Sequence, residues 1–131
     1  MTENTKENNK TESLAKTIKE NSIDVTKTYA VVIAQGKQYT VQAGSKLIID
    51  RLTTEPGQEV VLDNVLLIKK ADGSVTVGSP SITGAKVTAT VGYHMRGKKV
   101  RIFKKRIKQG YTKTIGHRQN LSYLTVKDIV A

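Results

Sequence analysis

The chain has 131 residues, the usual length of one domain, and 37% of them are hydrophobic, with no Trp, one Phe and five Tyr. Any core must therefore be built mainly from Val, Ile, Leu and Ala. The absence of Cys and of any apolar run near the roughly 20 residues that cross a bilayer excludes a membrane span, a disulfide framework, a thiolate metal site and a Cys nucleophile. We expect no secretion signal and a cytosolic protein.

The formal net charge of +11 lies almost entirely in the last third of the chain. Residues 1–27 carry as many acids as Lys and have no net charge, and residues 28–92 have a net charge of +1. Between Tyr93 and Arg118 there are ten basic residues and no acid. So many positive charges repel one another in a compact fold unless a polyanion neutralises them. This segment is the strongest lead to function.

Residues 1–27 are predicted to form an extension that is disordered or weakly helical. Residues 1–13 have no apolar side chain after Met1, so they cannot bury enough surface to offset the entropy of ordering. The spacing of Leu14 and Ile18 is typical of one or two helical turns, which is too short to be stable alone. The acids in this segment argue against an organelle transit peptide.

From residue 28 to residue 131 we predict a single all-β domain, either a small barrel or a two-sheet sandwich. Short β-branched runs alternate with Gly, Pro, Asn and Asp, the residues of tight turns. No segment keeps the 3.6-residue period of a helix, and eight or nine strands in about 100 residues favour a closed β architecture. The predicted strands are residues 29–34, 38–42, 46–50, 59–62, 65–69, 75–77, 85–92, 98–103 and 121–129.

Alternation of apolar and polar residues predicts which side chains of these strands point into the core. The continuous apolar runs 60–62 and 65–68 predict strands covered on both faces. Residues 70–74, Lys-Ala-Asp-Gly-Ser, give the clearest hairpin signal. The positions predicted to face inward are Tyr39, Val41, Val87, Ala89 and Val91.

One region departs from this strand-and-turn rhythm. Residues 104–120 contain six basic residues and only Ile107 and Ile115 as aliphatic ones, so little in them can anchor to a core. A connection this long in a small domain is usually functional or disordered. We predict that the flanking runs, residues 98–103 and 121–129, form the two legs of a projecting hairpin, with the basic arm at about residues 96–119.

Two expectations describe the shape of this hairpin. Gly110 and Gly116 are predicted to permit bends in it. In its first leg, alternation predicts that Val100 and Ile102 face the core, which leaves the intervening side chains on the opposite face.

The basic arm has what RNA binding requires: positive charges for phosphates, planar groups for unpaired bases, and glycines for close approach. Phe103, Tyr111 and His117 are the candidate stacking groups. A short basic run is often only a solvated face, but ten basic residues without an acid favour a nucleic acid, and the arm lacks the amphipathic period of a membrane-binding helix. The charged candidates are Arg96, Lys98, Lys99, Arg101, Lys104, Lys105, Arg106, Lys108, Lys113 and Arg118.

The sequence indicates no catalytic residue, no metal site and no cofactor. His94 and His117 are the only histidines, and without Cys a zinc site would need carboxylates from distant turns. There is no Gly-x-Ser-x-Gly nucleophile motif and no complete phosphate-binding loop. We therefore do not expect an enzyme.

Several motifs occur in the order seen in one known family. They are Tyr29-Ala-Val-Val, Gly36-Lys-Gln-Tyr39, Gly78-Ser-Pro80, Gly84-Ala-Lys-Val87, Gly97-Lys-Lys-Val-Arg-Ile-Phe-Lys104 and Gly116-His-Arg-Gln119. From residue 29 to about residue 129 the chain closely resembles bacterial large-subunit ribosomal protein twenty-one. The Gly-His-Arg-Gln motif after the basic arm is the most specific part of the match.

The resemblance implies a small β-barrel with an extended loop that inserts into large-subunit ribosomal RNA and supports assembly of the subunit in the cytoplasm. It implies the ribosomal protein numbered twenty as a neighbour. We expect no DNA, no membrane and no cofactor as a partner. Lys37 and Gln38 could also reach RNA. By position, the RNA-contacting motif falls on Lys98, Lys99, Arg101, Phe103, Lys104, Lys105, Arg106, Lys108, Tyr111, Lys113, His117, Arg118 and Gln119.

The alternative is a free translation or cold-shock-like factor that holds single-stranded RNA on a barrel face. Such proteins present an aromatic platform on adjacent strands, and the single Phe and scattered Tyr indicate none here. A third hypothesis is an enzyme with a basic substrate cleft, which would need a pocket with paired acids or a His beside a carboxylate.

Overall fold

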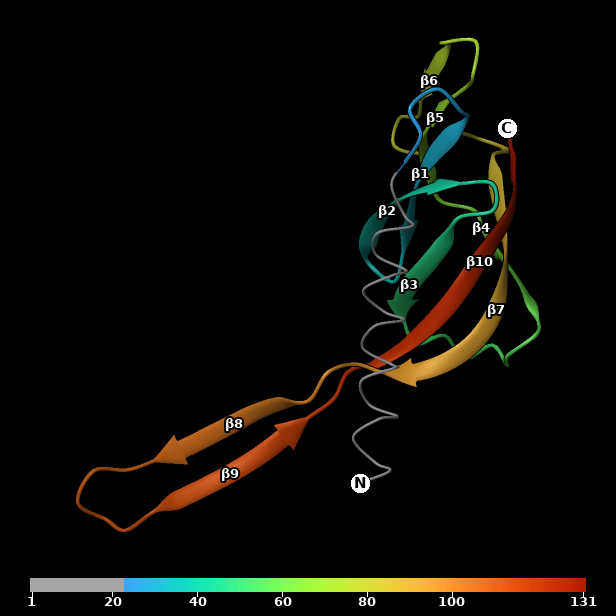
Figure 1. The fold of residues 1–131 in the computed structure, drawn as a ribbon. Helices are drawn as coiled ribbons and strands as arrows, with labels where there is room; N and C mark the ends of the chain where they lie inside the picture. The colour runs from blue at the N-terminus through green and yellow to red at the C-terminus, as the bar shows by residue number, and fades with distance from the viewer. Residues whose placement is uncertain (1–22) are drawn as a thin grey trace.

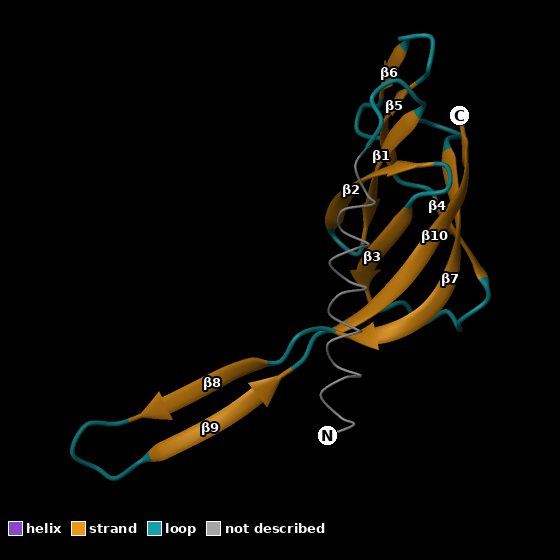
Figure 2. Cartoon of the chain, in the orientation of Figure 1, coloured by secondary structure: helices purple, strands orange, loops and turns teal. Residues whose placement is uncertain are grey.

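The computed structural model describes residues 23–131, and over this range it contains ten strands and no helix (Figures 1 and 2). Disorder or weak helix was predicted for residues 1–27: residues 1–22 lie outside the described residues, and residues 23–27 form a hydrogen-bonded turn and not a helix. The strands are β1 (Tyr29–Ala34), β2 (Lys37–Gln42), β3 (Lys46–Asp50), β4 (Glu59–Leu62), β5 (Val65–Lys69), β6 (Val75–Val77), β7 (Lys86–Arg96), β8 (Val100–Lys105), β9 (Thr112–His117) and β10 (Asn120–Val130).

Eight of these strands form two four-stranded antiparallel sheets, in the orders β2-β1-β5-β6 and β3-β10-β7-β4. We call them together the two-sheet domain. The chain passes from one sheet to the other three times, over residues 43–45, 63–64 and 78–85. At the first crossing Gly44 N–H donates to the carbonyl of Val126, and Val126 N–H donates to that of Ser45, both at 2.9 Å. The predicted all-β fold with a separate basic hairpin is confirmed.

The core between the sheets is aliphatic, as the composition requires. Of the side chains predicted to point inward, Tyr39 packs on the core partly buried and the other four are fully buried. The continuous apolar run in β4 was predicted to be covered on both faces, which is wrong: Val61 is 50% exposed, because an antiparallel sheet of this kind keeps one face in water. The core residues are Ala30, Val32, Ala34, Val41, Leu47, Ile49, Leu62, Val65, Ile68, Ala85, Val87, Ala89, Val91, Leu124 and Val126.

Two tight turns fix the register of the first sheet. Gln35 and Gly36 join β1 to β2 with φ of 51° and 75°, as a two-residue turn with two left-handed residues requires. The predicted turn at residues 70–74 is confirmed. There Lys70 N–H donates to the Ser74 carbonyl at 2.9 Å, and the β5–β6 hairpin closes around it.

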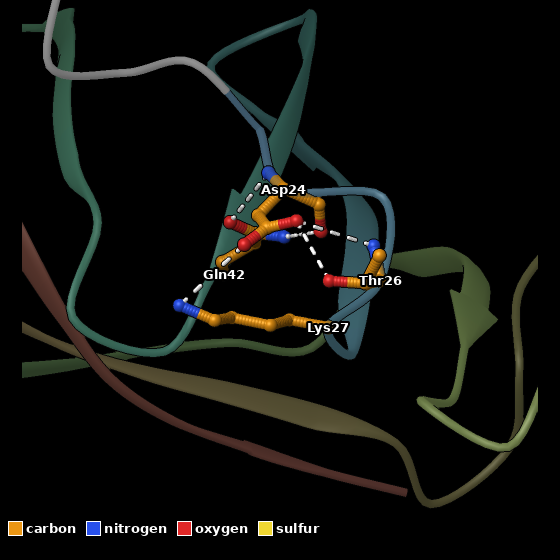
Figure 3. Close-up of polar contacts among 4 residues, drawn as sticks. All are labelled: Asp24, Thr26, Lys27 and Gln42. Carbon is orange, nitrogen blue, oxygen red and sulfur yellow. Dashed lines mark hydrogen bonds and ion pairs between the residues drawn. The ribbon is translucent and has the colours of Figure 1, made fainter.

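Hydrogen bonds attach the first described residues to the domain (Figure 3). Asp24 N–H donates to Oε1 of Gln42 at 3.2 Å, and Nε2 of Gln42 donates back to the Asp24 carbonyl at 2.6 Å. The Asp24 carboxylate accepts from the Thr26 hydroxyl at 2.8 Å and lies 3.6 Å from Nζ of Lys27. Segment 23–27 is therefore held against β2.

Candidate nucleic-acid interface

The basic arm is a hairpin of two strands that leaves the two-sheet domain (Figure 1). β8 and β9 pair antiparallel and form a sheet of their own, from Val100 opposite His117 to Lys105 opposite Thr112. The predicted projecting hairpin is therefore confirmed, but its second leg is β9, and the run at residues 121–129 that was predicted as this leg belongs to β10 of the domain. We call residues 96–119 the basic hairpin. β9 was not predicted as a strand, because its six residues contain a single aliphatic side chain.

The tip of the hairpin is closed by contacts between its two ends. Arg106 N–H donates to the Tyr111 carbonyl at 3.2 Å, and the guanidinium of Arg106 lies 5.6 Å from the Tyr111 ring centroid. Lys108 and Gly110 adopt φ of 62° and 59°, so the expected bend at Gly110 is confirmed. Gly116 instead lies inside β9, where a Cβ would overlap the end of the Lys99 side chain.

The prediction that Val100 and Ile102 face the core is wrong. These side chains are 57% and 38% exposed. The reason is that β7 continues to Arg96, beyond its predicted end at residue 92, and residues 97–99 then carry the chain outward. No second sheet lies opposite β8, so the alternation of its side chains no longer divides them into buried and exposed ones.

The cross-strand register gives the basic hairpin two different faces, since directly opposed residues share a face. One face has three long side chains on β8 above three small residues on β9: Arg101, Phe103 and Lys105 opposite Gly116, Thr114 and Thr112. The other face has an aliphatic part and a cationic end, formed by Val100, Ile102 and Lys104 opposite His117, Ile115 and Lys113.

All the predicted contact residues of the basic hairpin are exposed. Within residues 23–131, none of its Lys or Arg side chains forms an ion pair with a carboxylate. Lys104 and Lys113 are direct cross-strand partners, and like charges in that relation are destabilising. Anions bound between these side chains would remove this repulsion. The arrangement is suited to phosphates.

Where the hairpin joins the domain, Asp50 binds two of the predicted contact residues. It accepts from Nε2 of Gln119 and pairs with Nζ of Lys37, whose distances to the two carboxylate oxygens are 3.2 and 3.1 Å. This bond to Asp50 raises the pKa of Lys37. Gln38 lies exposed beside Lys37 at the start of β2. Sequence reasoning missed Asp50, because no local pattern links it to a residue 69 positions away.

Backbone bonds complete the base of the hairpin. Gly97 N–H donates to the Gln119 carbonyl at 2.8 Å, and Arg51 N–H donates to that of Asn120 at 3.2 Å. Nη1 of Arg118 donates to the Gly97 carbonyl at 3.3 Å. The two legs are thus tied to each other and to the chain that follows β3.

Just inside this base, a buried polar network holds β7 to β10. Ser122, with no exposed surface, accepts from Leu52 N–H at 3.0 Å, and its Oγ lies 2.8 Å from Nδ1 of His94. Nε2 of His94 is 3.0 Å from the Thr54 carbonyl. Because a carbonyl only accepts, Nε2 carries a proton, and the Ser122 hydroxyl can then donate to Nδ1. Both ring nitrogens of His94 are used in the fold.

An aromatic pair lies on the other side of the same two strands. The rings of Tyr93 on β7 and Tyr123 on β10 stack with centroids 4.8 Å apart and an interplanar angle of 14°. Sequence reasoning did not foresee this stacked pair on adjacent strands, in which one ring covers the other. The sequence separates these residues by 30 positions, and only the strand pairing brings them together.

Other kinds of site find little support in the described part of the chain. Residues 23–131 contain no group of three or more His, Cys, Asp or Glu placed to hold a metal ion. They also contain no helix long and apolar enough to cross a membrane. A surface pocket beside segment 23–27 is lined by Asp24 with no second acid and no His, so it lacks the groups that the enzyme hypothesis required.

Residues 28–129 match the family described as ribosomal prokaryotic L21 protein. Large ribosomal subunit protein bL21 of Treponema denticola is 45% identical over 102 residues, which cover 78% of this chain and 98% of that protein. The bL21 protein of Symbiobacterium thermophilum is 49% identical over 102 residues, covering 78% and 97%. That of Methylococcus capsulatus is 46% identical over 103 residues, covering 79% and 99%. This chain therefore belongs to the prokaryotic ribosomal protein L21 family, whose members named here are ribosomal proteins and not enzymes.

Proposed function

We propose that this protein is a structural constituent of the large ribosomal subunit, in the cytoplasm, and that it binds ribosomal RNA through the basic hairpin and supports subunit assembly. One observation carries the proposal: a projecting two-stranded hairpin exposes ten basic residues that no described carboxylate neutralises. Membership of the L21 family favours the ribosome over a free RNA-binding factor.

The mechanism is electrostatic positioning. Phosphates displace counterions when Lys and Arg neutralise them, and this term dominates affinity without reading sequence. In the hairpin, repulsion between side chains such as Lys104 and Lys113 is relieved at the same time. A narrow hairpin of this kind can lie between packed RNA helices, with Phe103, Tyr111 and His117 available to stack on unpaired bases.

The domain and the base of the hairpin have a different task in this proposal. Asp50 ties Gln119 to the end of β3 and so adds to the backbone bonds that hold the base of the hairpin on the domain. Gln119 and Lys37 then contact RNA from either side of the Asp50 carboxylate that both of them bind. The neighbouring ribosomal protein numbered twenty is the proposed protein partner, on the strength of the family resemblance alone.

Shortening the hairpin tests the proposal. Residues 104–113 are replaced by Asn-Gly, which closes a tight turn directly on the Phe103–Thr114 pair. The two-sheet domain should remain folded by circular dichroism, because the core residues are untouched. The variant should fail to stay with large subunits in sedimentation at high salt. Normal incorporation of this folded variant would contradict the proposal.

A further inference from the structure

The stacked tyrosines lie on the outer face of the sheet β3-β10-β7-β4. Ser122 and Leu124, the neighbours of Tyr123 on β10, are fully buried, so Tyr123 points to the opposite side of the sheet. Tyr93 is its direct cross-strand partner and is 48% exposed. The pair therefore presents an aromatic ring to solvent on a sheet surface.

The backbone around this pair is shaped to hold it. Tyr123 pairs with Tyr93 and Leu124 pairs with Val91, so Gly92 is the extra residue of a β-bulge. Bulges re-aim the side chains next to them. A Cβ at Gly92 would lie 3.0 Å from Cδ1 of Tyr123, closer than side chains normally approach. The Tyr123 ring thus lies against the glycine, and Tyr93 stacks on that ring.

We propose that the exposed ring of Tyr93 is a second RNA contact, a stacking site for an unpaired nucleobase. Tyr93 precedes Arg96, the first residue of the basic hairpin, by three positions on the same strand, which is about 10 Å of extended chain. The start of the basic hairpin is therefore close enough to this ring for one RNA strand to contact both. Base stacking on an aromatic side chain needs only an open π-face and tolerates every base.

The charges nearby are compatible with a polyanion. Glu59 lies opposite Thr90 on the strand next to β7, and its carboxylate is paired with Nζ of Lys127. The tyrosine pair could instead serve only to stabilise the sheet. In that case the two rings would still stack, but replacing Tyr93 would not change the affinity for RNA. That difference makes the inference testable.

The inference rests on the proposed function, because the ligand is RNA. Full-length wild-type protein and Tyr93→Leu are titrated with a short oligoadenylate and with its abasic counterpart of equal length. Tyr93→Leu should bind oligoadenylate about fivefold to a hundredfold more weakly. Its affinity for the abasic strand and the salt dependence of its binding should match those of the wild type, because no charge is lost. Tyr93→Phe should bind like the wild type.

The outcomes separate the two proposals. Equal oligoadenylate binding by Tyr93→Leu and the wild type overturns the stacking site and leaves the hairpin proposal intact. A wild-type protein that binds neither strand overturns both. Ultraviolet crosslinking of wild-type large subunits needs no variant and should attach a nucleotide to the peptide containing Tyr93. Crosslinks confined to the hairpin peptides would overturn the stacking site.

Discussion

The two-sheet domain and the basic hairpin are made of the same antiparallel strands, but they place equivalent side chains in opposite environments. Val91 on β7 is completely buried, whereas Val100, nine residues later on β8, is 57% exposed. A two-stranded hairpin by itself is only marginally stable in water. Strand pairing therefore gives the hairpin its shape, while burial in the domain provides the stability of the fold.

The charges of the two regions differ in the same way. In the domain, Lys37 is paired with Asp50 and Lys127 with Glu59. Among the described residues the hairpin cations have no carboxylate partner. Stability and the electrostatic part of binding are thus assigned to different groups of side chains, and substitution of a core side chain or of a hairpin charge should change only one of the two properties.

The sharpest test of this division compares two valines. Val91→Ala removes two methyl groups from the core and should lower the free energy of unfolding by about 2 to 3 kcal/mol. Val100→Ala removes the same atoms from an exposed strand and should change it by about 0.5 kcal/mol or less. Urea denaturation of both variants measures this. Equal losses would show that the hairpin contributes to the folded core.

A smaller effect is expected from the polar network at the junction of the two regions. Ser122→Ala leaves Leu52 N–H and Nδ1 of His94 without their buried partner, which should cost about 1 to 3 kcal/mol. Ser74→Ala is the matched control, because the exposed Ser74 hydroxyl bonds only to Asp72 in the β5–β6 turn. A loss at Ser122 no greater than that at Ser74 would contradict the network described here.

Local patterns were sufficient to predict much of the domain. The strands at residues 29–34, 46–50, 59–62, 65–69 and 75–77 have the predicted bounds, because turn residues and β-branched runs act over a few positions. The predicted strand ended at Gly92, whereas β7 runs through this glycine to Arg96 and forms a bulge there. The projecting hairpin was predictable from its charge and its lack of apolar residues.

Features that depend on tertiary contacts were not predictable. Alternation in β8 predicted that Ile102 faces the core. No second sheet packs against β8, so neither face of this strand is buried in the core. The link from Asp50 to Gln119 and the stacking of Tyr93 on Tyr123 join distant segments. The stacking also depends on the register of β7 and β10, which the bulge shifts by one residue.

The electrostatic side of the comparison is tested by removing two charges from each region. Lys104→Gln with Lys113→Gln should make the slope of log K against log salt shallower by about 1.4 to 1.8 for large-subunit RNA. The free energy of unfolding should not fall, because the pair repels itself across the strands. Lys70→Gln with Lys86→Gln removes equal charge from the domain, at two exposed positions outside the hairpin, and should leave the slope nearly unchanged. Equal changes of slope would mean that RNA binds without preference for the hairpin.

The smallest expected effect concerns the hydrogen-bonded turn from Asp24 to Lys27. Bonds from the Thr26 hydroxyl and amide, with a smaller contribution from Lys27, lower the pKa of Asp24 below its ordinary value of 3.8. A carboxyl group whose folded pKa is depressed stabilises the fold above the unfolded pKa, and this contribution disappears as pH falls through the folded pKa. The Thr26 amide resonance should therefore titrate with an apparent pKa below 3.8. It should lose this titration in Asp24→Asn, in which no carboxyl remains to change charge. A midpoint at or above the ordinary value would show that the bonds from Thr26 to the Asp24 carboxylate do not form in solution.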